Sequence, residues 1–250
     1  MCTLSFIPRS SGYLIGMNRD ERLAREQSLP PERISLNGVD AIYPREASGG
    51  TWIGSNSLGV TFALLNRNPG ATRIPKQRSR GFVIPPLLDY GSPVKAARRM
   101  AAANLEGMLP FRLIGCFPDA RAILEWNWDG NDLSAMQLPW RKRHWFSSGV
   151  SDVLASSIRG RTFYAAWRRR NAGSSDWLRR IHASHAPTPG ALSVCVHRPD
   201  AASVSYTEID CEMPALTMRH HAGYPCDGVG RFQSELVLDL KTRSRIAVAS

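Results

Sequence analysis

Two groups of reactive side chains lie close together at the start of the chain. Cys2 follows the initiator methionine, and the polar run from Asn18 to Glu21 follows an apolar stretch shortly afterwards. If Met1 is removed, the thiol of Cys2 and a free α-amine belong to the same residue. An α-amine, with an ordinary pKa of about 8, is a base that can take the proton of a thiol, whose ordinary pKa is about 8.5. The residue types therefore predict a nucleophile that carries its own base.

Three further side chains would complete such a site. Asp20 would hold the protonated amine by a charge-assisted hydrogen bond, and Arg19 would favour a thiolate or bind a substrate carboxylate. Asn66 ends an apolar run and offers an N–H donor to an oxyanion. With Cys2, these groups predict acyl transfer on a C–N bond through a thioester. The alternative interpretation makes Cys2 a small apolar residue at the start of a strand, and Arg19–Asp20 an ordinary ion pair.

The elements around these residues are predicted to be hairpins. Residues 2–8 and 13–17 are predicted to form two strands joined by a Ser-Ser-Gly turn. This hairpin brings the segment from Asn18 to Glu21 back towards the N-terminus. A Gly-Gly turn then enters a strand at 51–54, and the apolar run 60–65 ends at Asn66. Two such hairpins favour an antiparallel sheet. The segment 29–32 contains Pro30 and Pro31, so we expect an irregular crossing there.

Helices are grouped between strands instead of alternating with each one, which indicates an α+β fold. We expect helices at 82–89, 93–104, 159–170 and 174–185, and strands at 111–116, 122–128, 133–138, 191–196 and 202–207. No repeat or change in composition divides the chain. We predict one domain over residues 1–226 and a loosely attached tail over 227–250.

Composition narrows the class of protein. The chain has 250 residues, 43% of them apolar, and no apolar stretch of the about 18–20 residues that span a bilayer. It also lacks the apolar region of a secretory signal, so we expect a cytoplasmic protein without a transmembrane segment. The five cysteines form no Cys-x-x-Cys pair, which argues against disulfides and structural zinc. His182 and His185 share one helix face, but no carboxylate at ligand spacing completes a site, so we assign no metal.

The net charge of +11 raises the question of nucleic acid. The basic residues are not interleaved with the stacking aromatic residues of a single-strand binder, so we favour a solvated surface and no specific nucleic-acid partner. A nucleic-acid-associated protein that uses the arginine-rich helices between Arg159 and Arg180 stays a third hypothesis.

Several motifs in order resemble the NRDE family, also called the Transport and Golgi organisation 2 family, and its bacterial branch most closely. The first motifs are Met1-Cys2-Thr3, Asn18-Arg19-Asp20-Glu21, Gly49-Gly50-Thr51-Trp52-Ile53-Gly54 and Leu65-Asn66-Arg67. The later ones are His182-Ala183-Ser184-His185, the run from Gly190 to Arg198, Asp200-Ala201 and Ser203-Val204-Ser205. The resemblance extends from Met1 to about Cys226.

The resemblance implies a fold similar to N-terminal nucleophile hydrolases, a four-layer αββα sandwich of two mainly antiparallel sheets. By comparison with the related choloylglycine and penicillin V acylases, Cys2 would be the nucleophile, Asp20 would hold the amine, and Asn66 would be the first oxyanion donor. Met17 occupies the usual place of their arginine, and Arg19 lies two positions later. Ser148 would be the second oxyanion position. Their late arginine has no clear match, and we assign Arg198 to its place.

We therefore predict a catalytic set of Cys2, Arg19, Asp20, Asn66 and Ser148, and a substrate or cavity set of Asn18, Glu21, Trp52, Arg67, His197 and Arg198. The first hypothesis is a cysteine amidohydrolase for a small-molecule amide, with no required cofactor. The second, which follows from the family's association with haem and lipid handling, is a carrier of haem or of an acyl lipid or acyl-CoA that uses the same cavity. The oligomeric state is left open.

Overall fold

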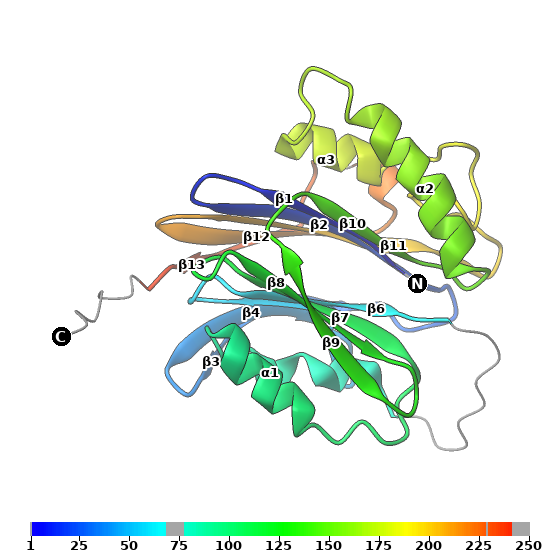
Figure 1. Cartoon of the computed structure of the whole chain (residues 1–250). Helices are drawn as coiled ribbons and strands as arrows, with labels where there is room; N and C mark the ends of the chain where they lie inside the picture. Colours follow the sequence, from blue (N-terminus) through cyan, green and yellow to red (C-terminus); the bar gives the residue numbers. More distant parts are fainter. Residues whose placement is uncertain (1, 69–77, 229, 242–250) are drawn as a thin grey trace.

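Two antiparallel sheets stack between two layers of helices in the computed structural model (Figure 1), which describes residues 2–68, 78–228 and 230–241. The six-stranded sheet has the order β10 (Arg143–Ser147), β1 (Cys2–Pro8), β2 (Gly12–Arg22), β11 (Ala201–Glu212), β12 (Ala215–Ala222) and β13 (Ser234–Asp239). The seven-stranded sheet runs in chain order, β3 (Leu29–Leu36), β4 (Val39–Arg45), β5 (Ile53–Asn56), β6 (Thr61–Asn66), β7 (Phe111–Phe117), β8 (Ala122–Trp128) and β9 (Leu133–Pro139). The predicted α+β, four-layer αββα architecture is confirmed.

Helices cover the outer face of each sheet. On one side, α2 (Asp152–Ala166) and α3 (Ser175–His182) lie over the six-stranded sheet (Figure 1). On the other side lie α1 (Pro93–Ala101) and the short 3₁₀ helices η1 (Arg80–Val83) and η2 (Pro85–Leu87), while η3 (Pro225–Asp227) follows β12. Ser151 and Ser174 cap α2 and α3, because each hydroxyl accepts a hydrogen bond from a first-turn N–H. No helix in the described ranges is both long and apolar enough to span a membrane.

Three apolar interfaces hold the four layers together. Between the sheets, residues such as Phe6, Ile15 and Leu65 are buried. A second cluster joins the seven-stranded sheet to α1, and a third joins α2 and α3 to the six-stranded sheet, with Phe163 and Trp177 at its centre. Because side chains alternate along a strand, one face of β1 and β2 looks towards the other sheet and the opposite face looks towards the helices.

The structure differs from several predicted elements. Leu29–Leu36 is a strand in spite of its two prolines, because it is the edge of its sheet and its register shifts between Leu29 and Glu32. Residues 191–196 are not a strand, and the nearest pairing is an isolated bridge between His197 and Ala202. The helix expected at 82–89 is replaced by two 3₁₀ turns, and α2 begins seven positions before Arg159.

The C-terminal segment is also better integrated than we expected. Ser234–Asp239 forms β13, which pairs with β12 from Ala215↔Asp239 to His220↔Ser234. Leu238 is 1% exposed within the core between the sheets. The expectation of a loosely attached tail is therefore wrong for this strand, whereas residues 242–250 of that tail lie outside the described residues.

Candidate active site

The first residue pairs of the N-terminal hairpin place Cys2 beside the polar tetrapeptide. β1 and β2 are antiparallel, with Cys2 opposite Arg19, and β1 also pairs with β10, with Cys2 opposite Ser147. The backbone N–H of Cys2 donates a hydrogen bond to Ser147 Oγ over 2.8 Å. Cys2 is 5% exposed. The nitrogen that would become the α-amine is therefore held by a neighbouring hydroxyl.

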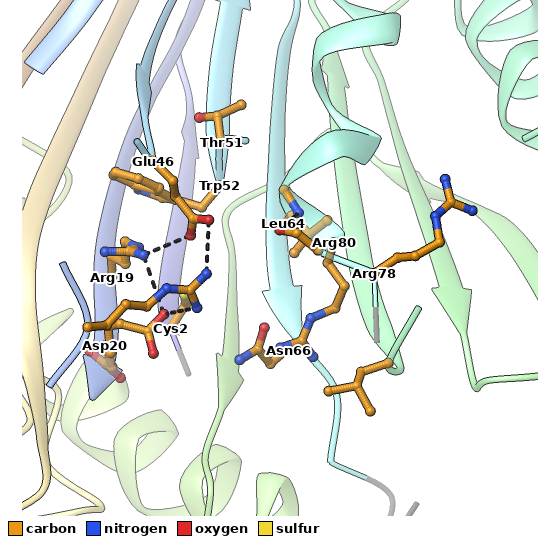
Figure 2. A pocket seen from close by; sticks show the side chains of 15 residues that line it. Cys2, Arg19, Asp20, Glu46, Thr51, Trp52, Leu64, Asn66, Arg78 and Arg80 are labelled. Atoms are coloured by element: carbon orange, nitrogen blue, oxygen red, sulfur yellow. Dashed lines mark hydrogen bonds and ion pairs between the residues drawn. The ribbon is translucent and has the colours of Figure 1, made fainter. Parts of the chain in front are cut away.

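A cavity of about 310 Å³ opens at these strand ends. Its walls come from β1, β2, β6, the β4–β5 connection and η1 (Figure 2). The lining residues are Cys2, Arg19, Asp20, Glu21, Arg25, Glu46, Thr51, Trp52, Leu64, Asn66, Arg78, Ser79, Arg80, Gly81 and Leu109. Six of the predicted site residues thus share one cavity: Cys2, Arg19, Asp20, Glu21, Trp52 and Asn66.

Arg19 is fixed on the same sheet face as Cys2. Its Nη2 lies 2.9 Å from Glu46 Oε1 and 3.4 Å from Glu21 Oε2, and its guanidinium lies 4.4 Å from the ring centroid of Trp52. Arg25 bridges the same two glutamates from the solvent side. The side chain of Arg19 is only 5% exposed, so these contacts hold its charge in one place beside the thiol.

Asp20 lies on the other face of β2, against the helical layer. Its Oδ1 accepts a hydrogen bond from Ser203 Oγ over 2.6 Å, and its Oδ2 lies 3.8 Å from Nη1 of Arg159. The register of β11 shifts between Ser203 and Ser205, so a bulge faces Asp20 and Arg19. Burial raises the pKa of Asp20, while the charge of Arg159 and the hydroxyl of Ser203 oppose that rise.

Burial is also the largest influence on the pKa of the Cys2 thiol. It raises the pKa of Cys2 above the ordinary value, while the backbone N–H of Asp20 and the guanidinium of Arg19 act in the opposite direction. A buried thiol is a weak nucleophile until its proton is taken, so chemistry at Cys2 requires a base close to the sulfur.

Asn66 and Arg80 lie on the wall opposite Cys2 and Asp20 (Figure 2). Asn66 is the last residue of β6 and is half-buried. The η1 segment is brought close by the Gly-Gly motif, because a Cβ at Gly50 would lie 3.1 Å from the backbone of Gly81. The N–H of Thr51 donates to the Gly81 carbonyl over 3.0 Å, which holds this wall against the β4–β5 connection.

The other predicted site residues do not line this cavity. Asn18 points into the helical layer, where its Nδ2 donates to the carbonyls of His182 and Val194 over 2.8 and 3.0 Å. Ser148 belongs to the turn before α2, and its Oγ accepts a hydrogen bond from the N–H of Val150. Asn18 therefore ties β2 to the helical layer, and Ser147 is the serine that contacts the Cys2 nitrogen.

Arg67, His197 and Arg198 also lie outside the cavity lining. The N–H of Arg67 donates to the Pro110 carbonyl over 3.1 Å. Arg198 forms an ion pair of 2.9 Å with Asp200. His197 lies between two cysteine sulfurs, away from the cavity walls.

Arg159 is a residue of the site that sequence reasoning missed. Its side chain is wholly buried, and it donates to Thr3 Oγ1 over 2.9 Å and to the Ala191 carbonyl over 3.0 Å. Burial lowers its pKa, opposed by the charges of Asp20 and Cys2. The signal was the spacing of Ala155, Arg159 and Phe163, which places all three on the buried face of α2. Ser147, Glu46 and Arg80 were missed as well, and no local pattern marks them.

The arrangement combines a buried thiol, a carboxylate, an amide and several guanidinium groups around one cavity. Such a set suits attack of a thiolate on a carbonyl carbon, with an N–H donor across the cavity for the oxygen that becomes negative. Of the cavity-lining side chains, one is a cysteine and none is a histidine. The bases that remain at this cavity are its carboxylates and, once Met1 is removed, the main-chain amine of Cys2.

Comparison with known proteins gives a family match over about two thirds of the chain. The model of the family described as Transport and Golgi organisation 2 matches residues 1–168. No curated protein sequence matches the chain.

Solved structures share the fold at low sequence identity. A mutant conjugated bile acid hydrolase from Clostridium perfringens has a TM-score of 0.52 and 10% identity, covering 96% of this chain and 92% of that chain. Another variant of that hydrolase has a TM-score of 0.51 and 10% identity, covering 98% and 100%. Penicillin V acylase from Agrobacterium tumefaciens has a TM-score of 0.50 and 10% identity, covering 88% and 82%. These likenesses confirm the predicted fold, similar to N-terminal nucleophile hydrolases.

Proposed function

The chain belongs to the Transport and Golgi organisation 2 family, and from this premise we propose that it is an N-terminal cysteine amidohydrolase that cleaves a C–N amide bond of a small molecule. The observation that carries the proposal is the convergence of Cys2, Asp20 and Asn66 at one cavity. Two structures with this fold are named a bile acid hydrolase and an acylase, which supports the same class of reaction.

The reaction begins after removal of Met1. The α-amine of Cys2 takes the thiol proton, and Sγ attacks the carbonyl carbon of the amide. Asn66 donates an N–H to the oxyanion of the tetrahedral intermediate. Collapse of the intermediate breaks the C–N bond, and the proton passes to the leaving amine. Water then cleaves the thioester, which releases a carboxylic acid and restores the thiol.

The surroundings of Cys2 assist these steps. Ser147 Oγ, 2.8 Å from the Cys2 nitrogen, holds the amine in position. We assign to Asp20 the role of stabilising the charge of the protonated amine, while the guanidinium of Arg159, 3.8 Å from Asp20 Oδ2, balances the charge of the carboxylate. Nη2 of Arg19 lies 2.9 Å from Glu46 Oε1, and this ion pair holds the positive charge of Arg19 at the cavity wall.

The arginines of the opposite wall indicate an acidic substrate. Nη1 of Arg80 donates to the Pro110 carbonyl over 3.0 Å, and Nη1 of Arg78 donates to the carbonyls of Asn104 and Glu106. Within residues 2–68, 78–228 and 230–241, neither guanidinium takes part in an ion pair, and Arg80 extends towards Asn66 while Arg78 points away (Figure 2), so Arg80 offers its positive charge to the cavity. We therefore assign as substrate class small amides that carry a carboxylate.

The test uses the purified, tag-free protein and a panel of N-acyl amino acids beside the corresponding neutral N-acyl amines. Intact mass spectrometry should show that Met1 is absent and that brief incubation adds an acyl group, which peptide mapping locates at Cys2. Cys2→Ala should lower hydrolysis to the background rate. The matched control Cys116→Ala, which removes another buried thiol, should retain activity.

Two results would overturn the proposal. Retention of Met1 in most molecules would remove the amine base, and amide hydrolysis that survives Cys2→Ala would assign the nucleophile elsewhere. The carrier hypothesis would be favoured by two results together: the wild-type protein hydrolyses no amide, and the Cys2→Ala variant binds haem or acyl-CoA with the same affinity as the wild type.

A further inference from the structure

A second group of reactive side chains lies outside the cavity, on the helical side of the six-stranded sheet. It consists of two histidines and two cysteines, His185, Cys195, His197 and Cys226, whose ligand atoms all lie within 4.8 Å of one another. We call these four residues the His/Cys cluster. They come from the segment after α3, the segment before β11 and the 3₁₀ turn η3, so distant parts of the chain meet there.

Several contacts link the members of the cluster. Nε2 of His197 lies 3.6 Å from Sγ of Cys195 and 3.3 Å from Sγ of Cys226. The ring of His185 is perpendicular to that of His197, with 4.9 Å between centroids. Nε2 of His185 is buried and has no hydrogen-bond partner in the described part of the chain. A buried ring nitrogen without a partner is unfavourable unless something binds it.

These separations match a tetrahedral metal site. Zinc binds cysteine sulfur at about 2.3 Å and histidine nitrogen at about 2.0–2.1 Å, so neighbouring ligand atoms lie about 3.3–3.8 Å apart. The two nitrogen–sulfur distances, 3.6 and 3.3 Å, already lie within this range, and a separation of 4.8 Å, the upper limit in the cluster, must shrink by about 1 Å.

The charges also balance. On binding Zn²⁺, the two thiols lose their protons to solvent and the two imidazoles stay neutral, so the +2 ion meets two negative sulfurs. Cys195 is buried, whereas His185, His197 and Cys226 are half-buried, which leaves a route for the ion to enter. We propose that the His/Cys cluster is a closed, four-ligand zinc site with a structural role.

Such a site would stabilise the back of the active-site strand. The residue after Cys195 is Val196, whose N–H donates to Ser203 Oγ over 2.8 Å, and Ser203 in turn donates to Asp20. A zinc ion at the cluster would join this segment to the end of α3 and to η3. The spacing of the four residues in the chain did not predict the site, because no Cys-x-x-Cys pair is present.

The test measures metal directly and does not depend on any amide hydrolysis. Tag-free protein, expressed with added zinc and kept reduced, should contain about one zinc per chain, as the four donors hold a single ion. Replacement of zinc by Co²⁺ should give the thiolate-to-cobalt absorption and the ligand-field bands of a tetrahedral site. Chelation should lower the Tm of the wild-type protein.

Variants identify the ligands. Cys226→Ser should weaken Co²⁺ binding by more than about 100-fold, because loss of outer-shell partners alone weakens metal binding 10–100-fold. The matched control Cys116→Ser, in the core between the sheets, should bind Co²⁺ like the wild type. His185→Gln is a second variant, should Cys226→Ser fail to fold. Three outcomes would each overturn the proposal. The wild-type protein could contain no zinc and show no thiolate-to-cobalt absorption after Co²⁺ is added. Cys226→Ser could bind Co²⁺ as tightly as the wild type, or Cys195 and Cys226 could form a disulfide in place of metal.

Discussion

The carboxylate of Asp20 lies 3.8 Å from the guanidinium of Arg159, and neither side chain is exposed. The two residues are far apart in the chain and come from β2 and α2. Arg159 also contacts Thr3, the next residue after Cys2 in β1, and the carbonyl of Ser147, which lies opposite Cys2 in β10. One buried cation therefore connects the three strands around the candidate nucleophile to the helix that covers them.

Removal of this cation should destabilise the fold strongly. Arg159→Met leaves Asp20 as a buried charge without its main counter-charge, which costs about 3–5 kcal/mol of unfolding free energy. In an Asp20→Asn background the same change should cost much less, because no charge is left unbalanced. Urea denaturation of both single variants and the double variant measures this coupling. Arg161→Met, at an exposed position of α2, is the control, and equal losses in both backgrounds would contradict the prediction.

Asn66 should affect the chemical step more than binding. Asn66→Ala removes the proposed oxyanion donor, so we expect kcat to fall by about 100–1000-fold while KM changes little. Steady-state kinetics with an N-acyl amino acid measures both constants. Asn131→Ala, in an exposed turn, should match the wild type. A variant that raises KM alone would instead assign Asn66 to substrate binding.

Arg80 should act on the substrate's charge. Arg80→Gln removes a cavity cation, so KM for carboxylate-bearing amides should rise by about 10-fold or more, because a hydrogen bond to a charged group contributes about 1.5–3 kcal/mol. KM for the neutral counterparts should change little. Arg98→Gln, on the exposed face of α1, is the matched control. Equal effects on charged and neutral amides would contradict a carboxylate site.

His182 should make stability depend on pH. It is 0% exposed, with Nε2 2.8 Å from Ser5 Oγ and Nδ1 2.9 Å from Asn18 Oδ1, and burial lowers its pKa to about 3. The unfolded chain takes up this proton below pH about 6.5, so the folded state loses stability as pH falls from about 6.5 towards 3. Between pH 7 and pH 5 the loss from this residue should be about 2 kcal/mol.

Denaturant unfolding at both pH values, for wild type and His182→Gln, isolates this contribution. The variant should be less stable at pH 7 but should have a weaker pH dependence. Leu178→Ala destabilises the same interface without removing an ionisable group, so it should keep the wild-type pH dependence. The same dependence in His182→Gln as in the wild type would rule out the assignment.

The sequence alone determined the meeting of Cys2 with Arg19 and Asp20. A short turn and the two-residue period of strands decide which residues of a hairpin face one another, and both are local properties. The same reasoning placed Asn66 at the end of an apolar strand, where it does line the cavity. The motifs also identified the family, which its family model confirms over residues 1–168.

The tertiary structure alone decided which distant residues join them. The order β10-β1-β2-β11 brings Ser147 and Ser203 beside Cys2 and Asp20, and the docking of α2 on this sheet buries Arg159 next to Asp20. The His/Cys cluster likewise forms where three connecting segments meet above one sheet. Strand order and helix docking depend on burial across the whole chain, and no local spacing encodes them.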